Sequence, residues 1–227
     1  MFRTLITAIG WILIMIIAVV ELITFFGLLK RSLYNKRKVC TYMALLALGL
    51  FFDAAVLSVG RFVGTGSLLQ TLSKVRMIVR GFMIPLILPI CAYALDMKNS
   101  PKRVFWLLML ACSAAGVVAA VFAKIVPSPR AGIVRYTSSS ATPLWADAIS
   151  MYMPLAIYAI LILCGFAMIF KAKTIWILLA GLVVAGLTVV GQFTGFEDLS
   201  FLFASFGEMW MLVFFHAYTK KLKKSYL

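Results

Sequence analysis

Seven long apolar runs occupy most of the sequence and constrain its fold more than any other feature. A helix needs about 20 apolar residues to cross the hydrocarbon core of a bilayer. Since that core contains no water, each spanning segment must satisfy its backbone hydrogen bonds internally, which favours helices. The runs predict spanning helices near residues 6–29, 41–62, 77–97, 104–125, 149–170, 174–192 and 199–219. The expected fold class is therefore all-α, a polytopic membrane protein built as a bundle of seven transmembrane helices.

The composition agrees with this fold class. Hydrophobic residues make up 64% of the chain and charged residues only 13%, against roughly 25% charged residues in an ordinary soluble domain. The first run, from Leu5 to Leu29, is longer than the apolar core of a signal peptide, so we expect a spanning helix there rather than a cleaved leader. Seven helices leave few residues for anything else, which predicts a single integral membrane domain over residues 1–227.

The distribution of basic residues predicts an orientation. The chain has 22 Lys and Arg residues and a formal net charge of +15, which in a soluble protein would suggest a nucleic-acid partner. Here fourteen of the 22 lie in three short connections and the C-terminal tail, at residues 30–38, 98–103, 171–173 and 220–224. Cytoplasmic loops carry an excess of Lys and Arg. We therefore expect the N-terminus outside and the C-terminus inside a plasma membrane, with anionic inner-leaflet lipids at the basic segments and no nucleic acid.

The longest stretch without an apolar run lies between residues 124 and 148. It contains three prolines and a Ser/Thr cluster, a composition typical of loops. The predicted orientation places this loop outside. Two interpretations stay open: the loop caps a cavity in the bundle, or it is a flexible linker with Tyr136 and Trp145 at the membrane interface.

Three charged residues lie at similar depths in three different predicted spanning helices. With the rise of an α-helix, Asp53 lies roughly 22 Å above the basic flank, Glu208 roughly 18 Å and Arg80 roughly 27 Å. A charge that faces lipid costs about 2.5 to 3.5 kcal/mol on insertion scales. We therefore expect all three side chains to turn inward and meet, with Arg80 as the counter-charge of the two carboxylates.

Two further charged residues are candidates for the same polar centre. Arg76 lies one turn from Arg80 on nearly the same helix face, and it either joins the centre or extends to the outer headgroups. Glu21, on the first predicted helix, has no basic residue at its depth. A carboxyl group without a partner in a low-dielectric interior favours its protonated form. Glu21 is thus either a proton site or a hydrogen-bond donor to a neighbouring helix.

Motifs of catalysis and cofactor binding are missing from the sequence. One histidine and no CxxC pair argue against a zinc site, and no GxSxG, P-loop or dinucleotide fingerprint occurs. The layout, with Arg80 on the outer part of the third helix and Asp96 at its inner end, resembles that of microbial rhodopsins in topology. That family holds retinal through a lysine midway along the last helix, where this chain has Glu208 and no lysine. We therefore expect no cofactor and carry no function over.

Three classes of function fit these features. The leading hypothesis is a carrier or channel-like protein for a small solute or ion, with Asp53, Arg80 and Glu208 as its polar centre and Glu21 as a possible proton site. The alternative is a ligand-sensing or accessory membrane subunit, in which the buried charges only fix the packing of the helices. The third class is an enzyme that acts on lipid through two carboxylates as acid and base, for which no nucleophile or metal set is evident.

Overall fold

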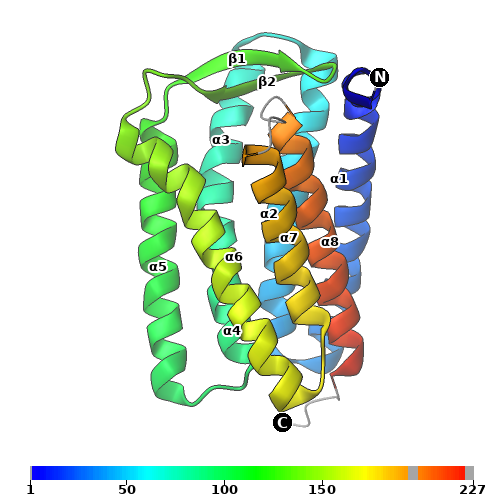
Figure 1. Cartoon of the computed structure of the whole chain (residues 1–227), viewed down its shortest axis with the longest axis vertical. Helices are drawn as coiled ribbons and strands as arrows, with labels where there is room; N and C mark the ends of the chain where they lie inside the picture. Colours follow the sequence, from blue (N-terminus) through cyan, green and yellow to red (C-terminus); the bar gives the residue numbers. More distant parts are fainter. Residues whose placement is uncertain (1, 194–198, 223–227) are drawn as a thin grey trace.

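The computed structural model of the chain describes residues 2–193 and 199–222. Within them, seven helical segments are long and apolar enough to cross a membrane, and they run side by side as a bundle (Figure 1). The seven-helix prediction is confirmed. The helices outside the third span are α1 (Phe2–Asn35), α2 (Lys38–Val63), α5 (Asn99–Phe122), α6 (Leu144–Ala172), α7 (Trp176–Phe193) and α8 (Ser200–Lys221).

The third span is interrupted at a proline. It consists of α3 (Ser67–Met83), the 3-10 turn η1 (Ile84–Leu86) and α4 (Ile87–Ala94). Pro85 within η1 has no N–H, and its ring clashes with the preceding helical turn. The helix therefore tightens into 3-10 geometry at this point instead of continuing as a regular α-helix.

The third span also begins earlier than predicted. α3 starts at Ser67, whereas the apolar run predicts a start near residue 77. The first turns of α3 contain Gln70 and Lys74, so they lack the continuous apolar run by which spanning helices are recognised.

The stretch between residues 124 and 148 contains a β-hairpin, so the flexible-linker interpretation is wrong. The fold is otherwise helical, as expected, and this hairpin is its one addition among the described residues. β1 (Ile125–Arg130) pairs antiparallel with β2 (Ile133–Ser138). The two residues between the strands, Ala131 and Gly132, have φ values of 52° and 72°. Positive φ at both positions is the geometry of a type I′ turn, whose twist matches that of the paired strands.

The prolines that suggested a loop are compatible with an edge strand. In a hairpin with a two-residue turn, the pair next to the turn is hydrogen-bonded, and bonded pairs recur at every second residue. Arg130 pairs with Ile133 beside the turn. Pro127 and Pro129 alternate with the bonded positions of β1, where the ladder needs no N–H.

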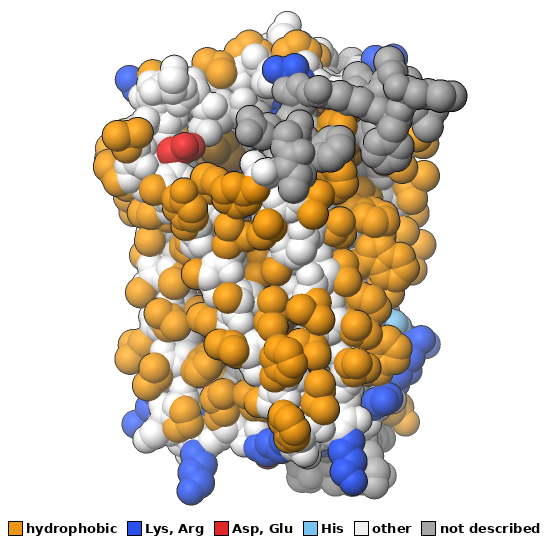
Figure 2. Space-filling view, in the orientation of Figure 1, with side chains coloured by type: hydrophobic (Ala, Val, Ile, Leu, Met, Phe, Trp, Pro, Cys, Tyr) orange, Lys and Arg blue, Asp and Glu red, His pale blue; other side chains and the backbone are white. Residues whose placement is uncertain are grey.

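The two ends of the bundle differ in character. The hairpin lies across the end at which α1 begins, and α8 ends at the opposite end (Figure 1). Apolar side chains cover the middle of the face in Figure 2, and Lys and Arg side chains gather along its lower edge. We call these the hairpin end and the basic end. The tail lysines Lys223 and Lys224 lie outside the described residues.

An apolar core fills the bundle, and glycines allow its helices to approach closely beside the charged residues. Tyr158 and Phe215 are among its largest fully buried side chains. A Cβ atom added at Gly116 of α5 would lie 2.6 Å from the carbonyl oxygen of Gly81 in α3. The two backbones therefore touch next to Arg80, which fixes the part of α3 that carries the arginines.

Candidate functional site

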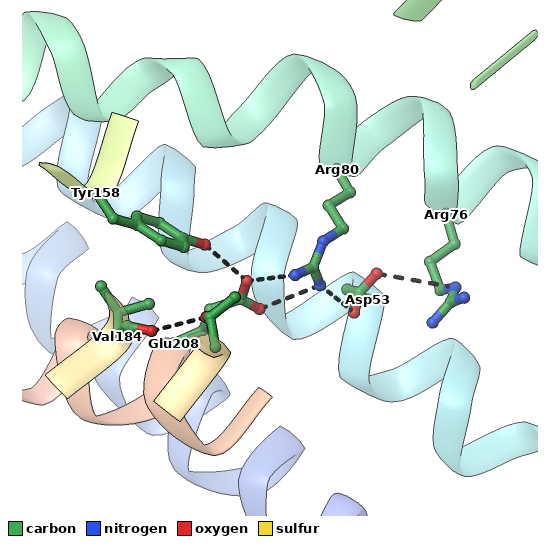
Figure 3. A network of polar contacts seen from close by, with 7 residues as sticks. Asp53, Arg76, Arg80, Tyr158, Val184 and Glu208 are labelled. Carbon is green, nitrogen blue, oxygen red and sulfur yellow. Dashed lines mark hydrogen bonds and ion pairs between the residues drawn. The ribbon is translucent and has the colours of Figure 1, made fainter. Parts of the chain in front are cut away.

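Three helices bring Asp53, Arg80 and Glu208 into direct contact inside the bundle (Figure 3). Arg80 of α3 donates to Glu208 of α8 through Nη2 to Oε1 at 2.6 Å and through Nη1 to Oε2 at 3.2 Å. Its Nη1 also donates to Oδ2 of Asp53 in α2 at 3.2 Å. Asp53 is 3% exposed and Glu208 1%. Buried carboxylates need an opposite charge and hydrogen bonds, and the forked guanidinium supplies both.

Tyr158 adds a fourth helix, α6, to this polar centre. Its hydroxyl donates to Glu208 Oε1 at 3.0 Å, and its side chain is buried. The sequence does not mark Tyr158 as a site residue, because a tyrosine in an apolar run carries no charge. The available signal is its place in the middle of the predicted helix, away from the membrane interfaces that tyrosine prefers.

Arg76 also turns toward the polar centre. Its Nε lies 3.8 Å from Asp53 Oδ1, and its side chain is 11% exposed (Figure 3). This placement agrees with the interpretation in which Arg76 joins the centre, and not with the one in which it extends to the headgroups. Asp53 therefore lies between two arginines that are one helical turn apart.

Glu21 is buried but is not joined to the arginines by any ion pair among the described residues. Within the same part of the chain its Oε2 has no hydrogen-bond partner. Gly27 of α1 packs against His216 of α8, so counting back along both helices places Glu21 near the level of Glu208, slightly toward the basic end. Glu21 is thus a neighbour of the polar centre rather than one of its paired members.

A cavity of about 270 Å³, which we call the chamber, lies between the polar centre and the hairpin. Charged side chains on its wall come from α2, α3 and β2: Asp53, Arg76, Arg80 and Arg135. Polar side chains from the hairpin, α7 and α8 complete much of the rest: Thr137, Ser138, Thr188, Gln192 and Ser205. The chamber is thus a small cavity with a charged floor and a wall of mixed polar and apolar side chains.

The hairpin covers the chamber and is held to α2 near its turn. A Cβ atom added at Gly60 would lie 2.0 Å from the carbonyl oxygen of Val134, so only glycine allows β2 to lie this close. Arg61 Nη1 donates to the carbonyl oxygen of Gly132 at 3.2 Å. Arg135 stacks on Phe201 of α8, with its guanidinium carbon 4.1 Å from the ring centroid. Of the two interpretations of this stretch, a segment that caps a cavity is the one found.

Toward the basic end the chamber stops at the apolar core. Ile84 lines the chamber and also belongs to the core, whose other members include Leu46, Ile87 and Leu212. A separate cavity of about 570 Å³ lies at the basic end. Its basic lining residues are Lys36, Arg37, Lys38 and Lys171. The two cavities share no lining residue, so packed apolar side chains separate them.

These features define a class: a seven-helix bundle of the multi-pass membrane type, with a buried arginine–carboxylate centre under a covered chamber. No protein-family model matches the chain, and the comparison with curated proteins found no match. Among residues 2–193 and 199–222, no three His, Cys, Asp or Glu side chains gather as a metal site.

Proposed function

We propose that the protein binds a small polar solute in the chamber, and that the solute arrives from the hairpin end. The observation that carries this proposal is the chamber itself, a cavity whose floor is formed by Asp53, Arg76 and Arg80. Binding sites are typically concave and place a few polar groups so that they converge on the ligand.

The energetics of buried charge support a binding role. Charged side chains within a membrane-spanning bundle are costly and usually mark pathways or ligand sites. Arg80 and Glu208 satisfy one another, so packing alone would explain that pair. Packing does not explain Arg76, which adds a second buried arginine beside Asp53 and faces the chamber.

A carrier is the first form of this proposal. Solute carriers often bind their substrate where a spanning helix is discontinuous. Here the third span breaks at Pro85, and Ile84 in the same turn lines the chamber. A rearrangement at this break would open the chamber toward the basic end, and Glu21 on the far side of the centre would be the proton site of such a carrier.

A ligand sensor is the second form, and a different observation favours it. The apolar core closes the chamber toward the basic end. A sensor needs access from one side only, and it transmits binding through the helices that meet at the polar centre. The Arg80 contacts join α3 to α2 and α8, so a ligand at Arg76 would bias the packing of these helices.

The orientation follows from the charges at the two ends. We propose that the basic end lies in the cytoplasm and the hairpin end outside, in the plasma membrane. The cavity lined by Lys36, Arg37 and Lys38 then faces the inner leaflet, where anionic lipid headgroups are the expected partners.

Cysteine accessibility tests the proposal. Ser205 is 3% exposed and lines the chamber, whereas Ser113 is equally buried and lies outside it. With Cys112 replaced by alanine, Ser205→Cys should react with a small water-soluble thiol reagent added at the hairpin side, and Ser113→Cys should not. If the two cysteines are equally unreactive, the chamber is not reached by water and the proposal is wrong.

The same cysteine separates the two forms. The variant is reconstituted in vesicles with either the hairpin end or the basic end facing outward. A carrier should expose Ser205→Cys to reagent in both preparations, since its site alternates between the two sides of the membrane. A sensor should expose it from the hairpin side alone.

A further inference from the structure

The cavity at the basic end has three consecutive cationic residues on its lining, Lys36, Arg37 and Lys38. None of the three forms an ion pair with an acidic residue in the described part of the chain. The acidic residue of the lining is Asp96, which pairs with Lys102 at 3.5 Å instead. The three cations are therefore available to a ligand.

Arg37 differs from its two neighbours in its surroundings. Lys36 and Lys38 are exposed, as expected of residues that only set the orientation of the bundle. Arg37 is half-buried, and its Nε is buried without a hydrogen-bond partner among residues 2–193 and 199–222. Buried polar groups are nearly always hydrogen-bonded in native proteins, so this exception needs an explanation. An acceptor in the cavity would give this guanidinium a partner.

Helix α2 begins at the same place. Arg37 is its N-cap residue, and the Arg37 side chain makes no capping hydrogen bond. The first N–H groups of a helix have no partner within the helix, and here they belong to Lys38 and Val39, which both line the cavity. Free N–H groups and the positive end of the helix dipole both favour a bound anion.

The carbonyl groups at the end of the third span, which would repel an anion, are already covered. Helix α4 ends at Ala94, and Lys171 Nζ donates to the carbonyl oxygens of Leu95 and Asp96 beyond it. A lysine near the end of a helix satisfies free carbonyls in this way. Lys171 is thus engaged, and residues 36–38 are left to contact the ligand.

The number of donors favours a phosphate monoester over other anions. Three cationic side chains and the first N–H groups of α2 belong to one cavity. A phosphate monoester has three free oxygens and close to two negative charges near neutral pH, whereas a carboxylate or a phosphate diester offers two free oxygens and one charge. The volume of about 570 Å³ equals the bulk volume of about 19 water molecules. It leaves room for the phosphate and for the alcohol that carries it.

We propose that the cavity at the basic end binds a phosphate monoester through Arg37, the lysines on either side of it and the first N–H groups of α2. The same group occurs in a lipid headgroup, that of phosphatidic acid, and in soluble compounds such as glycerol 3-phosphate. This second site lies apart from the chamber, and its binding depends neither on solute binding there nor on the orientation of the bundle.

Thermal unfolding of the purified protein in detergent tests the proposal, because a ligand that binds the folded chain raises the unfolding temperature. The probes are dioctanoyl phosphatidic acid and dioctanoyl phosphatidylglycerol, whose phosphate is a diester. Phosphatidic acid should give the same rise at a concentration about tenfold lower. Equal effects of the two lipids would overturn the choice of a monoester. If phosphatidic acid gives no rise, the site itself is wrong.

Glycerol 3-phosphate distinguishes the two sources of the group. It carries the same monoester without the acyl chains. A rise at the concentration that phosphatidic acid needs assigns the cavity to a soluble phosphate, and a rise only at a higher concentration assigns it to the lipid headgroup. Sodium chloride of equal ionic strength is the control for screening of the basic residues and should give no rise.

A variant assigns the effect to the cavity. Arg37→Gln should remove the rise caused by phosphatidic acid, and Arg37→Lys should weaken it, since a lysine keeps the charge but not the fork. The matched control is Arg103→Gln, which removes the same charge from the same end of the bundle at a residue that does not line the cavity. An unchanged rise in Arg37→Gln, or an equal loss in Arg103→Gln, would overturn the site.

The outcomes leave the proposed function to its own test. Solute binding in the chamber is measured by the reactivity of Ser205→Cys, which no phosphate compound at the other end of the bundle decides. The comparison of the probes uses the unmodified chain, so it stays valid if Arg37→Gln does not fold.

Discussion

Arg80 and Glu208 face one another through two parallel hydrogen bonds, of 2.6 Å and 3.2 Å, although 128 residues separate them in the sequence. Glu208 is almost completely buried. The contact joins α3 to α8 across the bundle. Arg80 is thus the counter-charge that compensates the buried carboxylate of Glu208.

Removing one partner of this pair should destabilise the protein more than removing both. Glu208→Gln and Arg80→Gln each leave an uncompensated charge, with an expected loss of about 3 to 5 kcal/mol. The double variant should lose clearly less than the sum of the two. Thermal unfolding of the purified protein in detergent measures all three.

An exposed ion pair of the same protein is the control for this comparison of single and double variants. Asp96 and Lys102 lie 3.5 Å apart, and the Asp96 side chain is 89% exposed. Asp96→Asn should leave the stability unchanged within error, since exposed pairs contribute little. Additive effects at Arg80 and Glu208 would mean that their contact contributes nothing to the fold.

The hydroxyl of Tyr158 should stabilise the charged form of the centre. Tyr158→Phe removes the hydrogen bond to Glu208 Oε1 and leaves the ring in place. A hydrogen bond to a charged group contributes about 1.5 to 3 kcal/mol, so we expect a lower unfolding temperature. Tyr152→Phe, at a residue of the same helix that is 57% exposed, is the control and should have no effect. Equal effects of the two substitutions would contradict the assigned role.

The position of the hairpin should depend on Gly60. Gly60→Ala places a Cβ atom where the carbonyl of Val134 lies, so the hairpin must shift. Forcing an atom into such a contact costs about 1 to 3 kcal/mol, and trypsin should cleave faster after Arg130 in β1. Gly186→Ala has open space around it and should leave the cleavage rate unchanged. If both variants are cut at the rate of the unmodified chain, the hairpin is not held through Gly60.

The orientation of the bundle is a separate prediction. A tag added after Leu227 should be reached by antibody only when the cytoplasmic side of the membrane is opened, because most basic residues lie at that end. An N-terminal tag on the same protein should be labelled on intact cells and serves as the control. Labelling of the C-terminal tag on intact cells would reverse the orientation.

The parts of the fold that a single chemical signal determines were predictable from the sequence. Long apolar runs predict spanning helices because a helix makes all its backbone hydrogen bonds within the segment. The meeting of Asp53, Arg80 and Glu208 was predictable for a related reason, since each would be costly in contact with lipid. The similar depths of the three residues along their helices were enough to predict that they meet.

The features that depend on tertiary contacts were not predictable in this way. The hairpin is unmarked in the sequence, because its prolines suggest a loop until the register shows that they avoid the bonded positions. Tyr158 joins the centre through one hydroxyl group, which no hydropathy pattern reveals. Arg76 had two acceptable environments, and the helix rotation that selects the inner one depends on contacts such as that of Gly81 with Gly116.

The spacing of the charged partners along the chain has a consequence for synthesis. Asp53 and Arg80 are 27 residues apart on consecutive spans, whereas Glu208 follows Arg80 by 128 residues. At about 5 to 20 residues per second, the ribosome needs roughly 6 to 26 s to reach Glu208 after making Arg80. During that interval Asp53 is the carboxylate that can balance the charge of Arg80. The last helix then completes a charge balance that the first helices began, so a chain that stops before Glu208 leaves its arginines in excess.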